Sequence, residues 1–160
     1  MRKIVIDTEV YKNYFLFSCK NMETGSVRHF EMYDGKRLDR ATIAKVMSSY
    51  TTISFNGNNF DLPIIALALS GASTEQIKKL GDTIITSGKP SWLICRELEI
   101  FVPRKWGHID LIEVAPGQAS LKIYGGRLHA PKLQDLPIEP DALIEPEQRD
   151  LMRRYCVNDL

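Results

Sequence analysis

Hydrophobic residues recur along the chain with the spacings of both strands and helices. Alternating or short continuous runs of apolar and β-branched residues predict strands at residues 3–10, 14–20, 27–33, 51–55 and 108–114. Helical spacing, capping signals or both predict helices at residues 39–50, 61–71, 73–86, 119–124 and 145–160. Residues 89–100 fit either structure. The order of these elements predicts an α/β fold, in which an antiparallel opening meander is followed by helix and strand alternation in a mixed sheet with flanking helices.

Composition narrows the class of protein without identifying it. With 160 residues, the chain is expected to form one domain, residues 1–160, and its net charge of +1 shows no polybasic tail. The longest apolar stretch, LPIIALALSGA, is too short to span a bilayer, so no membrane partner is expected. Three widely spaced cysteines predict neither a disulfide framework nor a zinc site, and favour a reducing, cytoplasmic compartment.

Acidic residues with possible chemistry occur at three places. Asp7 and Glu9 share one face of the first strand because side chains alternate with a period of two. Asp61 stands at the entry to an apolar helix, where it could simply cap the helix. Tyr155 and Asp159 are four residues apart and share one face of the last helix. Taken singly, each place has an ordinary explanation: solvated acids at a strand end, a helix cap, and an acid at a frayed end beside a half-buried aromatic ring.

The three places together form a more specific pattern. In chain order they are Asp7-x-Glu9, Asn56-x-x-x-Phe60-Asp61 and Tyr155-x-x-x-Asp159. This order resembles the three motifs of the DEDD, or DnaQ-like, 3′–5′ exonucleases. One branch of that family has His five residues before the final Asp, where this chain has Arg154, and the other has Tyr four residues before it. The chain therefore resembles the tyrosine branch, which includes proofreading domains of DNA polymerases, and IDTEVYKNYFLF and HIDL resemble phage polymerase segments.

The resemblance covers the whole chain and implies a fold, an activity and a set of site residues. The implied fold is ribonuclease-H-like, and the implied activity releases mononucleotides from the 3′ end of single-stranded DNA. It implies two divalent cations, Mg²⁺ or Mn²⁺, which prefer oxygen ligands; one would activate water and one would stabilise the leaving oxygen. The implied metal ligands are Asp7, Glu9, Asp61 and Asp159.

The resemblance also implies contacts beyond the metals. Tyr155 is expected to hold the attacking water, since a phenol with a pKa near 10 is a poor base at neutral pH. The backbone around Thr8 is expected to lie close to the terminal nucleotide, and Asn56 and Phe60 are expected to line its pocket.

Basic residues agree with a nucleic-acid substrate. Without the four implied metal ligands, 16 acidic residues remain against 21 basic residues, so the rest of the chain has a net charge of +5. Lys122, Arg127 and Lys132 lie in an irregular Gly- and Pro-rich segment, residues 115–140, where they could contact phosphates or be ordinary surface residues.

Several alternatives stay open. The chain could be a free-standing exoribonuclease, since tolerance of a 2′-OH is not visible in the sequence. It could also be a catalytically inactive nucleic-acid-binding domain, although all four acids and the tyrosine are present. Asp110 is expected to be structural rather than close to the metals, while His108, Trp92 and Trp106 have no assigned role. Because Asp159 lies one residue from the end and helix ends fray, we expect an N-terminal fragment of a longer, phage-type polymerase.

Overall fold

The computed structural model describes residues 2–117, 119–128 and 135–160, and five strands in them form one mixed sheet. The first three strands, β1 (Lys3–Tyr11), β2 (Tyr14–Asn21) and β3 (Val27–Tyr33), pair antiparallel. Two short strands, β4 (Thr51–Ser54) and β5 (His108–Asp110), extend the sheet in parallel from β1. The strand order is β3-β2-β1-β4-β5, so β1 lies at the centre.

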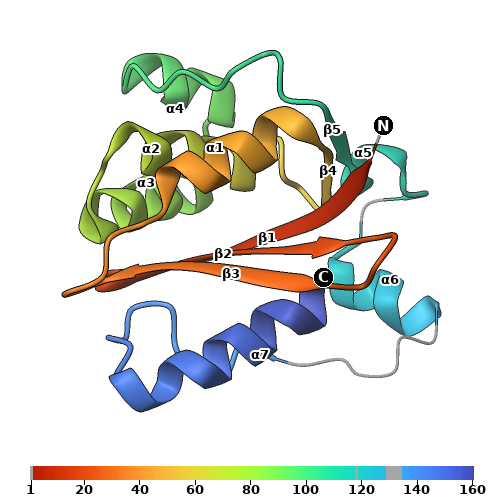
Figure 1. Cartoon of the computed structure of the whole chain (residues 1–160). Helices are drawn as coiled ribbons and strands as arrows, with labels where there is room; N and C mark the ends of the chain where they lie inside the picture. Colours follow the sequence, from red (N-terminus) through yellow and green to blue (C-terminus); the bar gives the residue numbers. More distant parts are fainter. Residues whose placement is uncertain (1, 118, 129–134) are drawn as a thin grey trace.

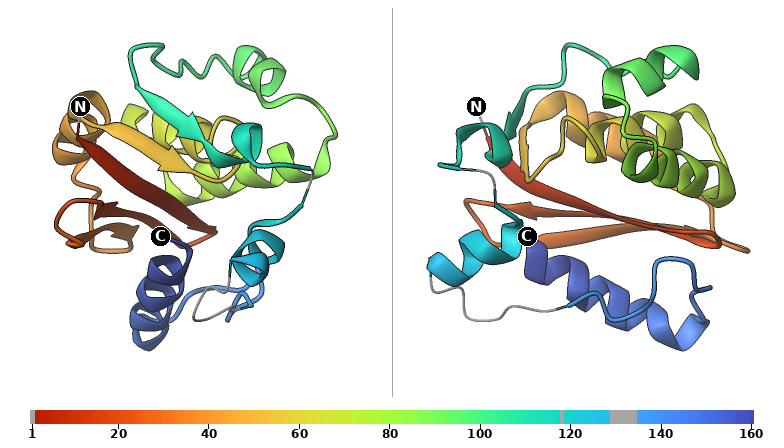
Figure 2. Two further views of the ribbon diagram at one scale, coloured as in Figure 1. Left: turned by 90° about the vertical axis from the view of Figure 1, so that its right-hand side faces the viewer. Right: turned by 180° about the vertical axis from the view of Figure 1, so that it is seen from behind.

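Helices cover both faces of this sheet (Figure 1). One face carries α1 (Arg40–Ser49), α2 (Asp61–Ser70), α3 (Thr74–Thr86) and α4 (Ser91–Glu97). The short helix α5 (Leu111–Val114) follows β5 directly. On the other side of the sheet lie α6 (Leu121–Arg127) and α7 (Arg149–Asp159), which a 3-10 turn at Pro146–Gln148 precedes. Both views in Figure 2 show the same layers, with the end of α7 beside α6.

The two faces of β1 enter two different cores. Ile4 and Ile6 are buried in the larger core beneath α1, α2 and α3. Tyr11 points to the opposite side and packs in a smaller core with Met152 and Cys156 of α7. Burial of one such side chain stabilises the fold by about 1.5–3 kcal/mol, so both helical layers are anchored firmly to β1. The alternation also sends Asp7 and Glu9 toward the α7 side.

Most of the expected elements are confirmed, and one is wrong in extent. The capping signal before α3 forms a capping box, in which Ser73 and Gln76 bond each other's backbone N–H. The ambiguous residues 89–100 contain α4. The strand expected at residues 108–114 ends at Asp110, because the Asp110 carboxylate accepts the Ile112 N–H at 3.2 Å and begins α5.

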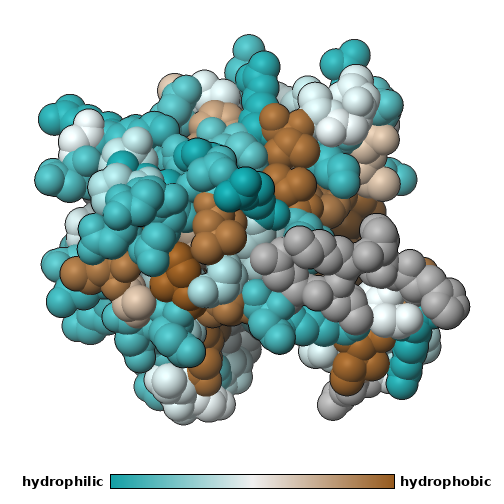
Figure 3. Space-filling model, turned by 90° about the horizontal axis from the view of Figure 1, so that it is seen from below, coloured by the Kyte–Doolittle hydropathy of each residue, from teal (hydrophilic) through white to brown (hydrophobic). Residues whose placement is uncertain are grey.

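Three further observations concern the cysteines, the helices and the molecular surface. Cys19, Cys95 and Cys156 are free thiols, and all three are buried. Among the described residues, no helix combines the length and the apolar character needed to cross a membrane. Viewed from the side of α7, the hydrophobic surface is divided into separate patches by hydrophilic side chains (Figure 3).

Candidate functional site

Asp7 and Glu9 meet Cys156 between β1 and α7. The Cys156 thiol donates a hydrogen bond to Asp7 Oδ2 at 3.1 Å. One possible ligand atom from each of these three residues lies within 4.8 Å of the other two. The sequence reasoning missed Cys156, because a single cysteine on an amphipathic helix is most simply a core residue. The helix register that brings Tyr155 and Asp159 toward β1 also brings this thiol to Asp7.

Asp61 joins the site from the opposite helical layer. It is the first residue of α2 and is 4% exposed. Its Oδ1 accepts the Thr8 hydroxyl at 2.6 Å, and its Oδ2 accepts the Ser54 hydroxyl at 3.1 Å. Its carboxylate is therefore held by hydroxyls from two neighbouring strands, β1 and β4, and does more than cap α2. The backbone of Thr8 is expected beside a nucleotide, and its buried side chain holds Asp61.

A buried acid on β3 fixes the position of α7. Glu31 accepts the Tyr14 hydroxyl at 2.9 Å and the Arg153 guanidinium at 2.8 Å. Met152 is fully buried beside this network. Because Arg153 precedes Tyr155 by two residues, the ion pair fixes the turn of α7 that carries the candidate site.

The last two predicted residues lie together on α7. Tyr155 is buried, and its hydroxyl donates a hydrogen bond to the Asp159 carboxylate. Burial raises the pKa of Tyr155 above its ordinary value, and the negative charges of Asp159, Glu9 and Asp7 raise it further. The phenol is therefore protonated at neutral pH and acts as a hydrogen-bond donor rather than a base.

The four acids form one electrostatic unit. Burial raises the pKa of Asp7 well above its ordinary range, and Asp61 and Asp159 raise it further against the hydrogen bond from Cys156. Burial and the other three carboxylates also raise the pKa of Glu9. These charge effects place the acids within electrostatic range of one another, and Asp7 and Glu9, with Cys156, are the described residues whose possible ligand atoms lie within 4.8 Å of one another.

The other two acids have partners that partly offset their burial. Burial raises the pKa of Asp61 to about 6, although the hydroxyls of Thr8 and Ser54 lower it. The pKa of Asp159 is also raised by burial, while bonds from Asn158 and Tyr155 and the charge of Lys122 lower it. A clustered set of oxygen ligands with unneutralised charge fits a hard divalent cation such as Mg²⁺ or Mn²⁺.

Asp110 holds the turn between β4 and α2. Its Oδ1 accepts the Asn56 N–H at 2.7 Å, and its Oδ2 accepts the Asn58 N–H at 2.8 Å. Asn56 has a positive φ of 61°, and its side-chain oxygen accepts a bond from Asn59. Asp110 therefore has the expected structural role, and it also raises the pKa of Asp61.

Gly57 in the same turn is a second residue that sequence reasoning missed. A Cβ at this position would lie 1.9 Å from Ser54 Oγ and 2.8 Å from His108 Nε2. Only glycine lets the turn approach the hydroxyl that holds Asp61. The NGNN sequence signals a turn, but it does not reveal this contact, because the contact depends on how β4 and β5 pair.

The predicted substrate-contact residues occupy different environments. Phe60 is half-buried and packs its ring over Gly81 of α3. Lys122 lies on α6, forms an ion pair with Asp135 at 2.6 Å and lowers the pKa of Asp159. A contact between Phe55 and Tyr124, with ring centroids 5.9 Å apart, holds α6 beside the end of β4.

The remaining candidates are peripheral to the acids. Arg127 is exposed at the end of α6, and Lys132 lies outside the described residues. Trp106 packs against the larger core, whereas Trp92 is exposed beneath the Arg96 guanidinium. His108 Nδ1 lies 2.8 Å from the Thr52 hydroxyl, within the sheet.

Comparison of the chain with models of known protein families gave no match, and neither comparison with curated proteins nor comparison with solved structures gave one. The function of this site is therefore inferred from its own geometry and chemistry.

Proposed function

We propose that this chain is a divalent-metal-dependent 3′–5′ exonuclease of the tyrosine branch of the DEDD family, with a ribonuclease-H-like fold. The observation that carries the proposal is that Asp61 and Asp159 raise the pKa of Asp7, and that these three acids raise the pKa of Glu9, beside a protonated Tyr155. The order of the five strands, with the antiparallel meander followed by two parallel strands, supports the proposed fold.

The proposed cofactors are two cations, Mg²⁺ or Mn²⁺, held by the four carboxylates. Bound cations of this kind supply charge stabilisation at phosphate oxygens and a lower pKa for bound water. Asp7 is central to the four acids, since its pKa responds to both Asp61 and Asp159. Thr8 and Ser54 lower the pKa of Asp61 and orient its carboxylate, and the Cys156 thiol acts in the same direction on Asp7 by donating to its carboxylate.

The Tyr155 hydroxyl takes part in hydrogen bonding and does not act as a base. Its hydroxyl is held by Asp159, so it is oriented toward the acids before any substrate arrives. Because its single proton is donated to Asp159, its oxygen can accept a hydrogen bond from an attacking water and orient that water without removing its proton. The proton of that water must pass to another acceptor, because the pKa of Tyr155 is raised.

The proposed substrate is the 3′ end of single-stranded DNA, and the product is a mononucleotide. Lys122 is the described cation whose charge acts on the site acids, and it is the best candidate for a phosphate contact. An exoribonuclease remains the second candidate, since no residue of the site distinguishes a 2′-hydroxyl. A polymerase domain attached after the chain is part of the proposal.

The direct test is digestion of a 5′-labelled single strand with Mg²⁺ or Mn²⁺. We expect a ladder that shortens from the 3′ end, stops with EDTA and disappears in Asp7→Asn. The exposed Asp34→Asn is the matched control for loss of one charge and should leave the ladder unchanged. Equal ladders from the wild type and Asp7→Asn would refute the proposal, and matched DNA and RNA strands would decide the substrate.

A further inference from the structure

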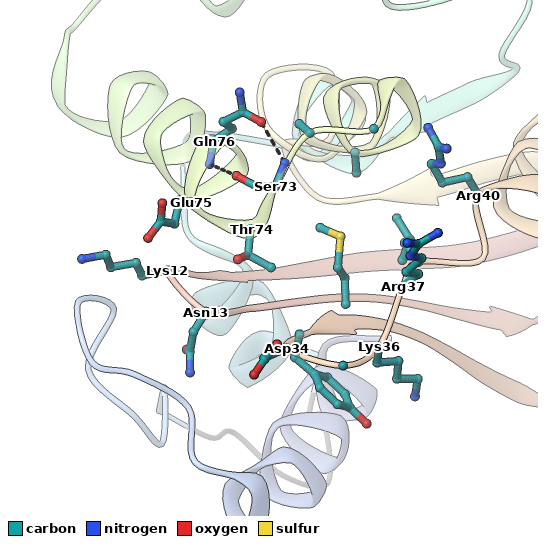
Figure 4. A pocket seen from close by; sticks show the side chains of 17 residues that line it. Lys12, Asn13, Asp34, Lys36, Arg37, Arg40, Ser73, Thr74, Glu75 and Gln76 are labelled. Carbon is teal, nitrogen blue, oxygen red and sulfur yellow. Dashed lines mark hydrogen bonds between the residues drawn. The ribbon is translucent and has the colours of Figure 1, made fainter.

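A separate cleft of about 860 Å³ lies beyond the C-terminal end of β1, between three loops. Its walls are the turn between β1 and β2, residues 34–40 after β3, and the turn that leads into α3 (Figure 4). None of the four site acids lines it. Its volume falls within the range of pockets that bind small molecules, about 300–1,000 Å³.

The cleft carries an excess of positive charge. Its ionisable lining residues are four cations and two anions, which leaves +2: Lys12, Lys36, Arg37 and Arg40, against Asp34 and Glu75. Lys36 Nζ forms an ion pair with Glu31 Oε2 at 2.7 Å. Arg37 and Lys12 have no hydrogen bond or ion pair among the described residues, and both are exposed. Unpaired cations facing a cavity favour an anionic ligand.

Arg40 is held in place at the rim. Its Nη1 lies 3.4 Å from the Leu69 carbonyl at the end of α2, and its other donors have no partner in the part of the chain that the structure describes. A Cβ on Gly71 would lie 2.8 Å from this Nη1, and Gly71 has a φ of 100°. Glycine is therefore needed for the left-handed end of α2, and its missing Cβ leaves room for the guanidinium above it. A guanidinium fixed before binding matches phosphate oxygens with little loss of conformational freedom.

The apolar lining of the cleft and the start of α3 indicate which chemical groups the ligand carries besides its negative charge. Met32, Leu38 and Ala72 form an apolar floor between the charged ends. Methionine adapts to flat ring systems, which suits a planar organic group. The α3 N–H groups are partly satisfied by the capping box of Ser73 and Gln76, so the arginines must supply the anion contacts.

We propose that the cleft binds a phosphate monoester with a ring-sized body, the class that includes mononucleotides. The phosphate lies between Arg37 and Arg40, and the ring lies over Met32 and Leu38. A phosphate monoester carries a charge near −2, opposite in sign to the +1 that the lining keeps when Lys36, paired with Glu31, is left out. This proposal does not depend on the exonuclease activity, because the cleft shares no residue with that site.

Nuclear magnetic resonance of the ¹⁵N-labelled chain in EDTA tests it, since EDTA removes any metal-dependent binding at the acids. We expect deoxyadenosine monophosphate to cause saturable shifts at the amides of Gly35, Arg37, Gly71 and Thr74. Deoxyadenosine and inorganic phosphate should each bind about tenfold more weakly or worse. Arg37→Gln should lower the affinity for the nucleotide by about tenfold, because it removes a charge-assisted hydrogen bond.

The control variant is Arg104→Gln, an exposed loop arginine outside the cleft, which should bind like the wild type. Shifts confined to residues outside the cleft, or unchanged affinity in Arg37→Gln, would overturn the proposal. Inorganic phosphate that binds as tightly as the nucleotide would reduce the cleft to a simple anion site and would also contradict it. Stronger binding of an acidic peptide with the same shifts would assign the cleft to a protein partner instead.

Discussion

Replacement of Asp61 by Asn should stabilise the metal-free protein. The substitution keeps the size of the side chain and removes one buried negative charge. The pKa of Asp61 is about 6 against an ordinary value of 3.8, a difference of about two units. At about 1.4 kcal/mol per unit, the ionised carboxylate destabilises the fold by about 3 kcal/mol at pH 7. Asp61→Asn should therefore raise the free energy of unfolding by up to this amount.

The dependence on pH separates this explanation from a packing effect. A carboxylate whose folded pKa lies above its unfolded value destabilises the fold fully above the folded pKa. The destabilisation disappears as the pH falls through about 6 toward the unfolded value of 3.8. The difference in stability between Asp61→Asn and the wild type should therefore be largest at pH 7 and should close by pH 4.

Urea unfolding in EDTA at pH 7 and pH 4 measures both quantities. A gain of about 3 kcal/mol corresponds to a rise in Tm of about 6–12 °C for a domain of this size. Asp34→Asn removes an exposed charge and should change stability little at either pH. Mn²⁺ should stabilise the wild type more than Asp61→Asn. A variant that is less stable than the wild type at both pH values would refute the reasoning from buried charge.

Three further substitutions test the supports of the site. Gly57→Ala places a Cβ 1.9 Å from the Ser54 hydroxyl, so urea unfolding should show a loss of about 1–3 kcal/mol. Tyr155→Phe should slow digestion of a labelled strand by about 10–100-fold, because it removes a hydrogen bond to a charged group, without altering the pH profile near neutrality. Hydrogen bonds from Lys36, Tyr14 and Arg153 lower the pKa of Glu31 despite its burial, so Glu31→Gln should destabilise the fold by about 1–3 kcal/mol at pH 7 and by less at pH 3.

Each of these three predictions has a control or an outcome that would contradict it. Gly107→Ala, where a Cβ would meet its nearest atom at 3.5 Å, is the control for Gly57 and should be milder. An equal loss in both glycine variants would show that the contact with Ser54 is unimportant. A pH profile that shifts in Tyr155→Phe would mean that the phenol titrates. A stability difference for Glu31→Gln that grows as the pH falls would contradict the sign of its pKa shift.

Local pattern predicted the elements and the faces of the site well. The period of two placed Asp7 and Glu9 together, and the spacing of four placed Tyr155 beside Asp159, because both relations depend only on the geometry of one element. The strand at residues 108–114 was predicted too long for the same reason. Its apolar pattern continues through Leu111, but the Asp110 carboxylate accepts the N–H of Ile112 and ends the strand.

Contacts between elements could not be predicted from the local sequence pattern. The hydroxyls that hold Asp61 belong to residues 53 positions before it and seven positions before it, and they meet only when β1 and β4 pair in parallel. Cys156 reaches Asp7 across 149 positions of sequence. The cleft with Arg37 and Arg40 is likewise formed by three loops that tertiary packing brings together. Such features depend on packing rather than on periodicity.

Mn²⁺ binding measured by titration calorimetry tests the central claim most directly, because it asks whether the four converging acids form a cation site. We expect saturable binding of Mn²⁺ to the wild type at pH 7, with competition by Mg²⁺. Asp7→Asn should weaken that binding by at least about tenfold, whereas Asp34→Asn should not change it. Equal Mn²⁺ affinity in the wild type and Asp7→Asn, or no saturable binding in the wild type, would contradict the claim.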